Sequence, residues 1–208
     1  MAKGIFMIAV VTNFYNPSKK DIKIQLKGDA KKEGAGVILT SGLHSTGEFS
    51  ILSPISISDT SWVCSFVAKI TDAEGISDAD GKGGDGIRFK LCSKDKQELF
   101  AVNLDTYKNL ENNSGNEIVV YFEGTKVAQA SCNERFNDGK EKNVEVIYNH
   151  ELETVVVRVN DMSIVAYAFH DMPFYGLVNQ PVMLCFSSFT GDAGGTHMVS
   201  DVKFDVNL

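Results

Sequence analysis

The amino-acid sequence predicts an all-β protein built as a sandwich of two antiparallel sheets. Apolar residues alternate with polar ones in short runs about ten residues apart, and residues that favour turns separate these runs. Almost no segment repeats its apolar residues at helical spacing over three turns. Thirteen short strands with this spacing are typical of two sheets packed face to face.

The expected strands follow these alternating runs along the chain. The loop Asn149–Glu153, between VEVIY and TVVVRV, predicts a hairpin. We also expect the first and last strands to pair with each other, because a sandwich has to protect its edges. In chain order, the predicted strands are Ile5–Val11, Ile22–Gln25, Gly36–Leu39, Gly47–Leu52, Ser61–Ile70, Ile87–Leu91, Leu99–Leu104, Ile118–Phe122, Val144–Tyr148, Thr154–Val159, Ile164–Phe169, Val182–Phe189 and Met198–Val206.

Length and charge limit the organisation of the protein and its partners. A chain of 208 residues is long enough for one sizeable core, and we expect residues 1–208 to form a single domain, since no repeat or linker interrupts them. The net charge of −7 argues against nucleic acid as a partner, because no basic face replaces the counterions of its phosphates. No apolar run is long enough to span a membrane.

The cysteines and the N-terminal run bear on the cellular compartment. Cys64, Cys92, Cys132 and Cys185 lack the paired spacing of a zinc site, and we expect buried free thiols. The apolar run GIFMIAVV after Lys3 is short and no small-residue cleavage pattern follows it, so we interpret it as a strand and not as a signal peptide. These features favour a cytoplasmic or unconventionally exported protein and leave the compartment itself open.

The stretch GGDGIRFKLCSKDKQELFAVNLDTYKN carries the residues best suited to binding chemistry. Its two strand-like runs have acidic turns, Gly84–Gly86 before the first and Asp105–Asn109 after the second. Two antiparallel strands place those turns at the same edge of a sheet. Asp85, Asp105 and Asn109 would then form an oxygen-rich pocket that suits Ca²⁺ and accepts hydrogen bonds from vicinal hydroxyls. The stretch predicts binding without catalysis.

Motifs of other functions fail on their structural context. The segment Gly81–Gly86 matches G-x-G-x-x-G but opens a strand, whereas a dinucleotide site requires a helix. The segment Asp78–Gly81 starts like a calcium loop, but Lys82 stands where a third oxygen ligand belongs. A glycosidase needs two facing carboxylates, and the strand AVNLD offers Asp105 with Asn103 in the second position. No nucleophile elbow G-x-S-x-G occurs, so we expect a protein that is not an enzyme.

Five segments, in order, resemble the L-type lectins, the group that comprises legume seed lectins and the legume-like cargo lectins of the animal secretory pathway. They are TNFYNPSKKDIKIQLKGDAKKEGAGVILT, SWVCSFVAKI, GGDGIRFKL, FAVNLDTYKN and CFSSFTGDAGGTHMVSDVKF, and the likeness covers nearly the whole chain. The resemblance implies a concanavalin A-like jelly roll, with a flat back sheet and a curved front sheet that carries a calcium and sugar site. It also implies glycans or glycoproteins as partners and is compatible with a homodimer formed through the back sheets.

The resemblance assigns the sugar-binding positions. Asp85 matches the family's sugar-binding aspartate, which usually follows a non-proline cis peptide, here Gly84-Asp85, and Gly86 completes this turn. Asn109 matches an asparagine that bridges calcium and sugar. The tripeptide Gly191-Asp192-Ala193 resembles the late loop that sets specificity, and its TGD opening is closest to the cargo lectins, which bind high-mannose glycans.

The resemblance also implies one Ca²⁺ site. Asp105 matches the calcium carboxylate, Tyr107 the residue that gives its backbone carbonyl, and Asn109 a further ligand. The glutamate that binds a transition metal in legume lectins is replaced by Asn103, so we expect no Mn²⁺ site. The fourth calcium ligand has no clear counterpart, and its candidates are Asn112, Asn113, Glu117 and Asp138.

Two hypotheses about function stay open. The leading one is a calcium-dependent, glycan-binding lectin of mannose type, in which Tyr107 or Phe136 stacks on the sugar ring. The alternative is a module of lectin fold that has lost sugar binding and serves a structural or protein-interaction role. It is motivated by Asn103 and by the family's glycine-rich sugar-contacting loop, which is shortened here to CSKDKQE. A glycan-cleaving enzyme is a third and weaker interpretation, because it rests on fold class alone.

Overall fold

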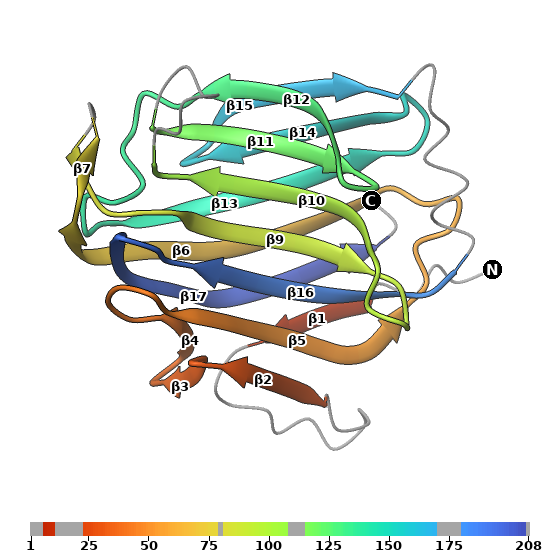
Figure 1. The fold of residues 1–208 in the computed structure, drawn as a ribbon. Coiled ribbons are helices and arrows are strands. Elements are labelled where there is room, and N and C mark those ends of the chain that lie inside the picture. Colours follow the sequence, from red (N-terminus) through yellow and green to blue (C-terminus); the bar gives the residue numbers. More distant parts are fainter. Residues whose placement is uncertain (1–5, 11–22, 79–80, 108–114, 170–179, 207–208) are drawn as a thin grey trace.

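Two β-sheets packed face to face form the protein (Figure 1). The computed structural model describes residues 6–10, 23–78, 81–107, 115–169 and 180–206, and within these ranges the chain forms strands, turns and loops but no helix. Accordingly, the described ranges hold no helix suited to crossing a membrane. The predicted all-β sandwich of two antiparallel sheets is confirmed.

The back sheet is built around two long central strands, β6 and β17. Its order is β15-β14-β13-β6-β17-β4-β3, and β1 pairs with β17 as well. The first and last described strands therefore pair with each other, as predicted. The strands of this sheet are β1 (Phe6–Val10), β3 (Lys31–Glu33), β4 (Gly36–Thr40), β6 (Trp62–Gly75), β13 (Glu141–Asn149), β14 (Thr154–Val159), β15 (Met162–Ala168) and β17 (Ala193–Val206).

The front sheet covers the back sheet and has β9 at its centre (Figure 1). Its order is β12-β11-β10-β9-β16-β5-β2, and a small two-stranded ribbon of β7 (Ser77–Asp78) and β8 (Gly81–Lys82) stands apart from it. The strands of this sheet are β2 (Ile24–Gly28), β5 (Thr46–Ile55), β9 (Gly86–Cys92), β10 (Glu98–Asp105), β11 (Glu117–Phe122), β12 (Thr125–Ser131) and β16 (Val182–Phe189).

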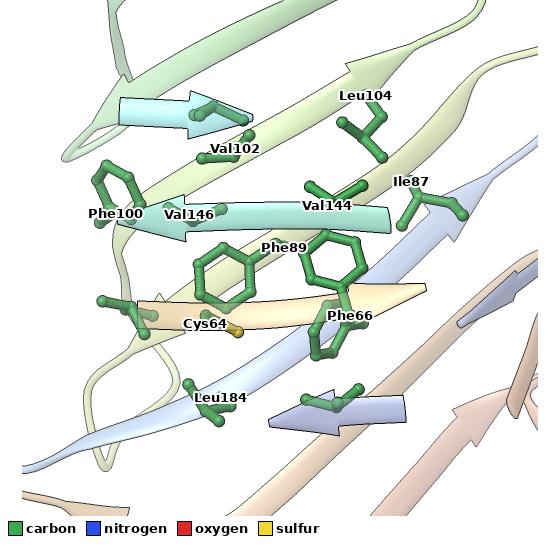
Figure 2. Packing of buried hydrophobic residues seen from close by; sticks show 14 of the residues in the cluster. Cys64, Phe66, Ile87, Phe89, Phe100, Val102, Leu104, Val144, Val146 and Leu184 are labelled. Carbon is green, nitrogen blue, oxygen red and sulfur yellow. The ribbon is translucent and has the colours of Figure 1, made fainter. Parts of the chain in front are cut away.

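Aromatic side chains from both sheets meet in the core. Figure 2 shows Phe66 of the back sheet beside Phe89 of the front sheet, with 6.1 Å between their ring centroids. Phe66 also packs edge to face against Phe186 at 5.0 Å, and such pairs add about 0.5–1.5 kcal/mol beyond the area they bury. Successive side chains of a strand point to opposite faces. The buried positions of β9 therefore leave Arg88 and Lys90 on the outer face of the front sheet.

All thirteen predicted strands are present, β14 and β16 with the predicted ends and the others with shifted ends, and the described residues hold four further strands that were not predicted. Of these, β3 is exposed along its length, and β12 is an edge strand without a fully buried residue, so neither has the apolar alternation that marks a half-buried strand. The strands β7 and β8 are two residues long. The four cysteines are free and buried, as predicted.

Candidate functional site

The two acidic turns predicted to meet do lie at the same edge of the front sheet. Strands β9 and β10 are antiparallel, and their register places Gly86 opposite Asp105. The Thr106 backbone N–H donates a hydrogen bond to the Asp85 carbonyl at 3.2 Å. The start of β9 is therefore joined to the end of β10, where the sequence placed the binding residues.

The turn at Asp85 is held by strands on both sides. Its peptide bond Gly84-Asp85 is cis, as the resemblance implied. On the β16 side, the Asp85 N–H donates to the Phe189 carbonyl at 3.1 Å. On the β10 side, Gly86 has a φ of +121°, and a Cβ there would lie 1.9 Å from the Leu104 carbonyl oxygen. Only glycine fits this position, so the glycine after Asp85 is required by the close approach of β10.

The late loop predicted to set specificity lies against the same turn. A Cβ added at Gly84 would lie 3.1 Å from the Tyr107 Cβ and 3.3 Å from the Ala193 Cβ, so Gly84 is packed between these residues. The Gly191 N–H donates to the Ala193 carbonyl at 3.1 Å, which closes the loop into a tight turn. The exposed Asp192 carboxylate lies 3.3 Å from His44 Nε2. Three segments far apart in the sequence therefore converge here.

Asp85 is partly withdrawn from water. Burial raises the pKa of its carboxyl above the ordinary value. A carboxylate that has lost part of its hydration gains more from a cation or from hydroxyl donors than a solvated one does. The electrostatics of Asp85 therefore suit a residue that receives a ligand.

A polar chain that the sequence did not reveal supports this turn from inside the sandwich. Ser188 Oγ donates to the Gly86 carbonyl at 2.7 Å, so Thr40 Oγ1 has to donate to Ser188 Oγ, at 3.2 Å. The Thr40 hydroxyl proton is then used, and the proton in its 2.7 Å contact with His197 must come from His197 Nδ1. Thr40, Ser188 and His197 are all buried. This chain links the back sheet to the turn that carries Asp85.

Next to the Asp85 turn, two neighbouring strands, β10 and β11, each contribute a carboxylate. Asp105 lies directly opposite Glu117 of β11, and both side chains are buried. The Tyr107 N–H donates to Asp105 Oδ1 at 3.1 Å, and Gln129 Nε2 donates to Glu117 Oε2 at 2.6 Å. Two carboxylates directly across an antiparallel pair repel each other unless a cation or proton offsets their charge. Their oxygen chemistry fits a hard cation such as Ca²⁺.

The structure narrows the candidates for the calcium ligands. Asn109, Asn112 and Asn113 lie outside the described residues, so their roles stay predictions. The Asp138 carboxylate accepts a hydrogen bond from the Lys140 N–H and pairs with Lys142 Nζ, each at 3.0 Å. Glu117 is thus the described candidate that faces Asp105. Among the described residues, no group of three or more His, Cys, Asp and Glu side chains is arranged to hold a metal ion.

Two predictions about aromatic and loop contacts are corrected. Phe136 is 1% exposed and belongs to the core, so it cannot stack on a ligand. The turn Ser93–Gln97 joins the far ends of β9 and β10, across the length of the strands from Gly86. The short length of this turn therefore does not affect the site at Asp85. An exposed aromatic next to the site is Phe189, the last residue of β16. The sequence pattern predicted its place in the strand but not its place beside the site.

A pocket of about 510 Å³ opens beside Asp85 on the outer face of the front sheet. This volume lies within the range of about 300–1,000 Å³ that small-molecule sites occupy. Phe189 lies at its edge with 56% of its surface exposed. The pocket is lined by Lys27, Gly28, Thr46, Gly47, Glu48, Asp85, Gly86, Arg88, Lys90, Asn103, Ser187, Ser188 and Phe189.

Comparison with known proteins places this geometry in a known fold. No family model matches the sequence, and no curated protein matches it. Among solved structures, the basic winged bean lectin with Tn-antigen superimposes with a TM-score of 0.76 at 16% identity, covering 99% of each chain. The acidic winged bean lectin complexed with methyl-α-D-galactose has a TM-score of 0.74 at 18% identity, covering 98% of this chain and 99% of the lectin. The chain has the L-type lectin fold.

The animal branch of this fold is similar as well. The exoplasmic/lumenal domain of VIP36, in its Ca²⁺- and mannose-bound form, has a TM-score of 0.68 at 17% identity, covering 87% of this chain and 82% of that domain. The predicted concanavalin A-like sandwich is thus confirmed as an L-type lectin fold. Identities this low establish the fold, and the ligand has to be argued from the residues of the site.

Proposed function

We propose that this protein is a carbohydrate-binding lectin without enzymatic activity. The observation that carries the proposal is the convergence of the cis Gly84-Asp85 turn, Tyr107 and the loop Gly191–Ala193 at one edge of the front sheet, beside a pocket. Asp85 supplies a partly desolvated acceptor for sugar hydroxyls, and Phe189 supplies an exposed apolar ring against which a sugar face can stack. Solved lectins of the same fold are complexed with galactose and mannose.

We further propose that sugar binding depends on calcium. Asp105, the Tyr107 carbonyl and Asn109 would hold the ion, with Glu117, which lies opposite Asp105, as the candidate for a fourth ligand. Bound calcium would offset the charge of the buried carboxylates Asp105 and Glu117. The TGD opening of the Gly191–Ala193 loop leads us to propose a mannose-type glycan as the neutral ligand.

Calcium dependence is tested by thermal unfolding with EDTA and with calcium. A ligand that binds only the folded state stabilises it by RT ln(1 + [L]/Kd), about 2.7 kcal/mol at a hundredfold excess over Kd. We expect calcium to raise the melting temperature and Asp105→Asn to abolish the rise. An equal melting temperature in EDTA and in calcium would contradict the metal site.

Sugar binding is tested on a glycan array with the wild type and Asp85→Ala. We expect Asp85→Ala to lose glycan binding while it keeps the wild-type circular dichroism spectrum. The matched control is Glu141→Gln, which removes an exposed carboxylate of the back sheet that pairs with Lys69. Unchanged binding by Asp85→Ala would refute the assignment of the site.

The alternative, a lectin fold that serves protein contacts, is favoured by one observation. Asn103 replaces the family's metal-binding glutamate, and its side chain lines the pocket instead. A folded protein that binds no glycan on the array, with or without calcium, would favour this alternative. Dimerisation through the back sheet stays a prediction, which sedimentation analysis tests.

A further inference from the structure

The pocket beside Asp85 extends across the outer face of the front sheet over five adjacent strands, from Asn103 on β10 to Lys27 on β2. From Asp85 at the start of β9 it runs across β16 and β5 to Lys27 on β2. Neighbouring strands lie about 4.8 Å apart, so this path is longer than a single sugar ring. A glycan anchored at Asp85 would therefore place a second sugar residue over β16 and β5.

Cations outnumber carboxylates along this path. The pocket is lined by the three cations Lys27, Arg88 and Lys90 and by the two carboxylates of Glu48 and Asp85. Such a surplus is unusual on a chain whose formal net charge is −7. Because Glu98 pairs with Arg88, the surplus that can act on a ligand comes from Lys27 and Lys90, which share the carboxylate of Glu48.

Arg88 is already occupied by partners of its own. Its Nε donates to Glu98 Oε2 at 3.0 Å, and a second nitrogen donates to Glu98 Oε1 at 2.5 Å. Its guanidinium also lies 4.2 Å from the centre of the Tyr121 ring. This geometry fixes Arg88 as part of the wall of the pocket.

The lysines share a single carboxylate. Glu48 lies 3.1 Å from Lys90 Nζ and 3.6 Å from Lys27 Nζ. A third amine, Lys96, is close to Lys27, and this closeness lowers the pKa of Lys96. Lys27 and Lys90 around the one carboxylate of Glu48 leave positive charge that an anion could neutralise. The Lys90 side chain is only 14% exposed, which strengthens its interaction with a bound anion.

We propose that the glycan bound by this protein is anionic, with a neutral sugar at Asp85 and a carboxylate- or sulfate-bearing residue between Lys27 and Lys90. The inference rests on the proposed function and names its ligand class. Lys90 donates to the anionic group from the floor of the pocket, and Lys27 donates from the β2 side. Carboxylates of uronic or sialic acids and sulfate esters share this chemistry, and the experiment separates them.

The test compares neutral glycans with their acidic counterparts. An array carries matched pairs that differ only by a uronate, a sialic acid or a sulfate ester, and it is probed with wild type, Lys27→Gln, Lys90→Gln and Asp85→Ala. The matched control is Lys126→Gln, which removes an exposed lysine of β12, in the same sheet and outside the pocket. Binding is repeated between about 50 and 300 mM NaCl, because salt screens the exposed part of the interaction.

We expect anionic glycans to bind about tenfold more tightly than their neutral counterparts, the size of one hydrogen bond to a charged group. Lys90→Gln should remove that preference and keep the neutral affinity, while Lys126→Gln should leave both unchanged. Whether the protein binds the carboxylate-bearing or the sulfate-bearing glycans more tightly identifies the anionic group of the ligand.

Three results would overturn the inference. Equal binding of neutral and anionic glycans would refute it and leave the proposed function intact. Anionic binding that survives Asp85→Ala would show a non-specific attraction to lysines. A folded protein that binds neither kind of glycan would refute the proposed function together with the inference.

Discussion

Two different polar regions lie on the two faces of the front sheet beside the turn that carries Asp85 and Gly86. On the inner face, His197, Thr40 and Ser188 form a buried chain of neutral groups that ends on the Gly86 carbonyl. On the outer face, the pocket carries ion pairs around Glu48 that remain partly exposed to water. Both regions are polar, and they lie on opposite sides of the same strands.

Because one region is buried and the other is partly exposed, they should contribute differently to stability and to ligand binding. A buried polar group that loses its partner costs about 1–3 kcal/mol, because water cannot replace the lost hydrogen bond. A partly exposed ion pair contributes about 0–1 kcal/mol, because water and salt compete for its charges. The inner chain should therefore set the stability of the turn, and the outer charges should be free to respond to a ligand.

The largest effect is expected at Gly86, where the two regions meet. Gly86→Ala places a Cβ 1.9 Å from the Leu104 carbonyl oxygen at a φ of +121°. We expect a loss of about 4 kcal/mol in the free energy of unfolding, or a protein that does not fold. Urea denaturation measures this loss. Wild-type stability in Gly86→Ala would show that β9 can move away from β10 and that the turn is not rigidly held.

The inner region should make stability depend on pH through His197. Burial lowers the pKa of His197 to about 4, from 6.5 in the unfolded chain. Between these two pH values the unfolded chain binds a proton that the folded protein excludes, so the free energy of unfolding falls as the pH falls. The decrease should reach about 3 kcal/mol over this window.

Urea denaturation of wild type and His197→Asn across that window isolates the histidine from the other titrating groups. Asparagine can still donate to Thr40 but does not titrate, so the variant should lack this part of the pH dependence. Parallel curves for the two proteins would contradict the assignment of a neutral, buried imidazole.

Two adjacent serines test the separation of the regions directly. Both serines line the pocket, but Ser188 is buried and its hydroxyl donates to the Gly86 carbonyl, whereas Ser187 is partly exposed on the outer face. We expect Ser188→Ala to lower the free energy of unfolding by about 1–2 kcal/mol and Ser187→Ala to change it by less than about 0.5 kcal/mol. Thermal and urea denaturation give both values. Equal losses would mean that the two faces support the turn alike.

The sequence predicts the strands and the acidic turns because both depend on local pattern. Alternation in β9 and β10 follows from the pleat of a half-buried strand, and antiparallel pairing then brings Asp85 next to Asp105. The cis bond and the role of the Gly191–Ala193 loop came from resemblance, since nothing in composition encodes them. The edge strand β12 packs only the small or partly buried side chains of Val127, Ala128 and Ala130 against the core, without a regular apolar alternation, and therefore gave no signal.

The two polar regions could not be predicted, because their contacts are not local. Thr40 meets Ser188 and His197 across 148 and 157 residues of sequence. In the sequence these residues stand beside other polar residues and form no motif, and Lys27, Glu48 and Lys90 are ordinary charges of three different strands. Their common location depends on sheet order, which alternation does not specify. His197 occupies a buried position in the alternating burial pattern of β17, and a polar residue at such a position is the feature that could have drawn attention to the inner chain.

A small effect on stability, together with a gain in binding, is expected at Glu48. Burial raises the pKa of Glu48, but the hydrogen bond and charge of Lys90 outweigh this effect and hold the pKa below its ordinary value. The Glu48 carboxylate therefore competes with any bound anion for the lysines. Glu48→Gln should cost less than about 1 kcal/mol of stability and raise the affinity for anionic glycans about threefold to tenfold. Binding assays at two salt concentrations measure this gain, with Glu141→Gln as the control. An affinity for anionic glycans that falls would show that Glu48 positions Lys90 for the ligand, and the outer charges would then act as a preformed unit.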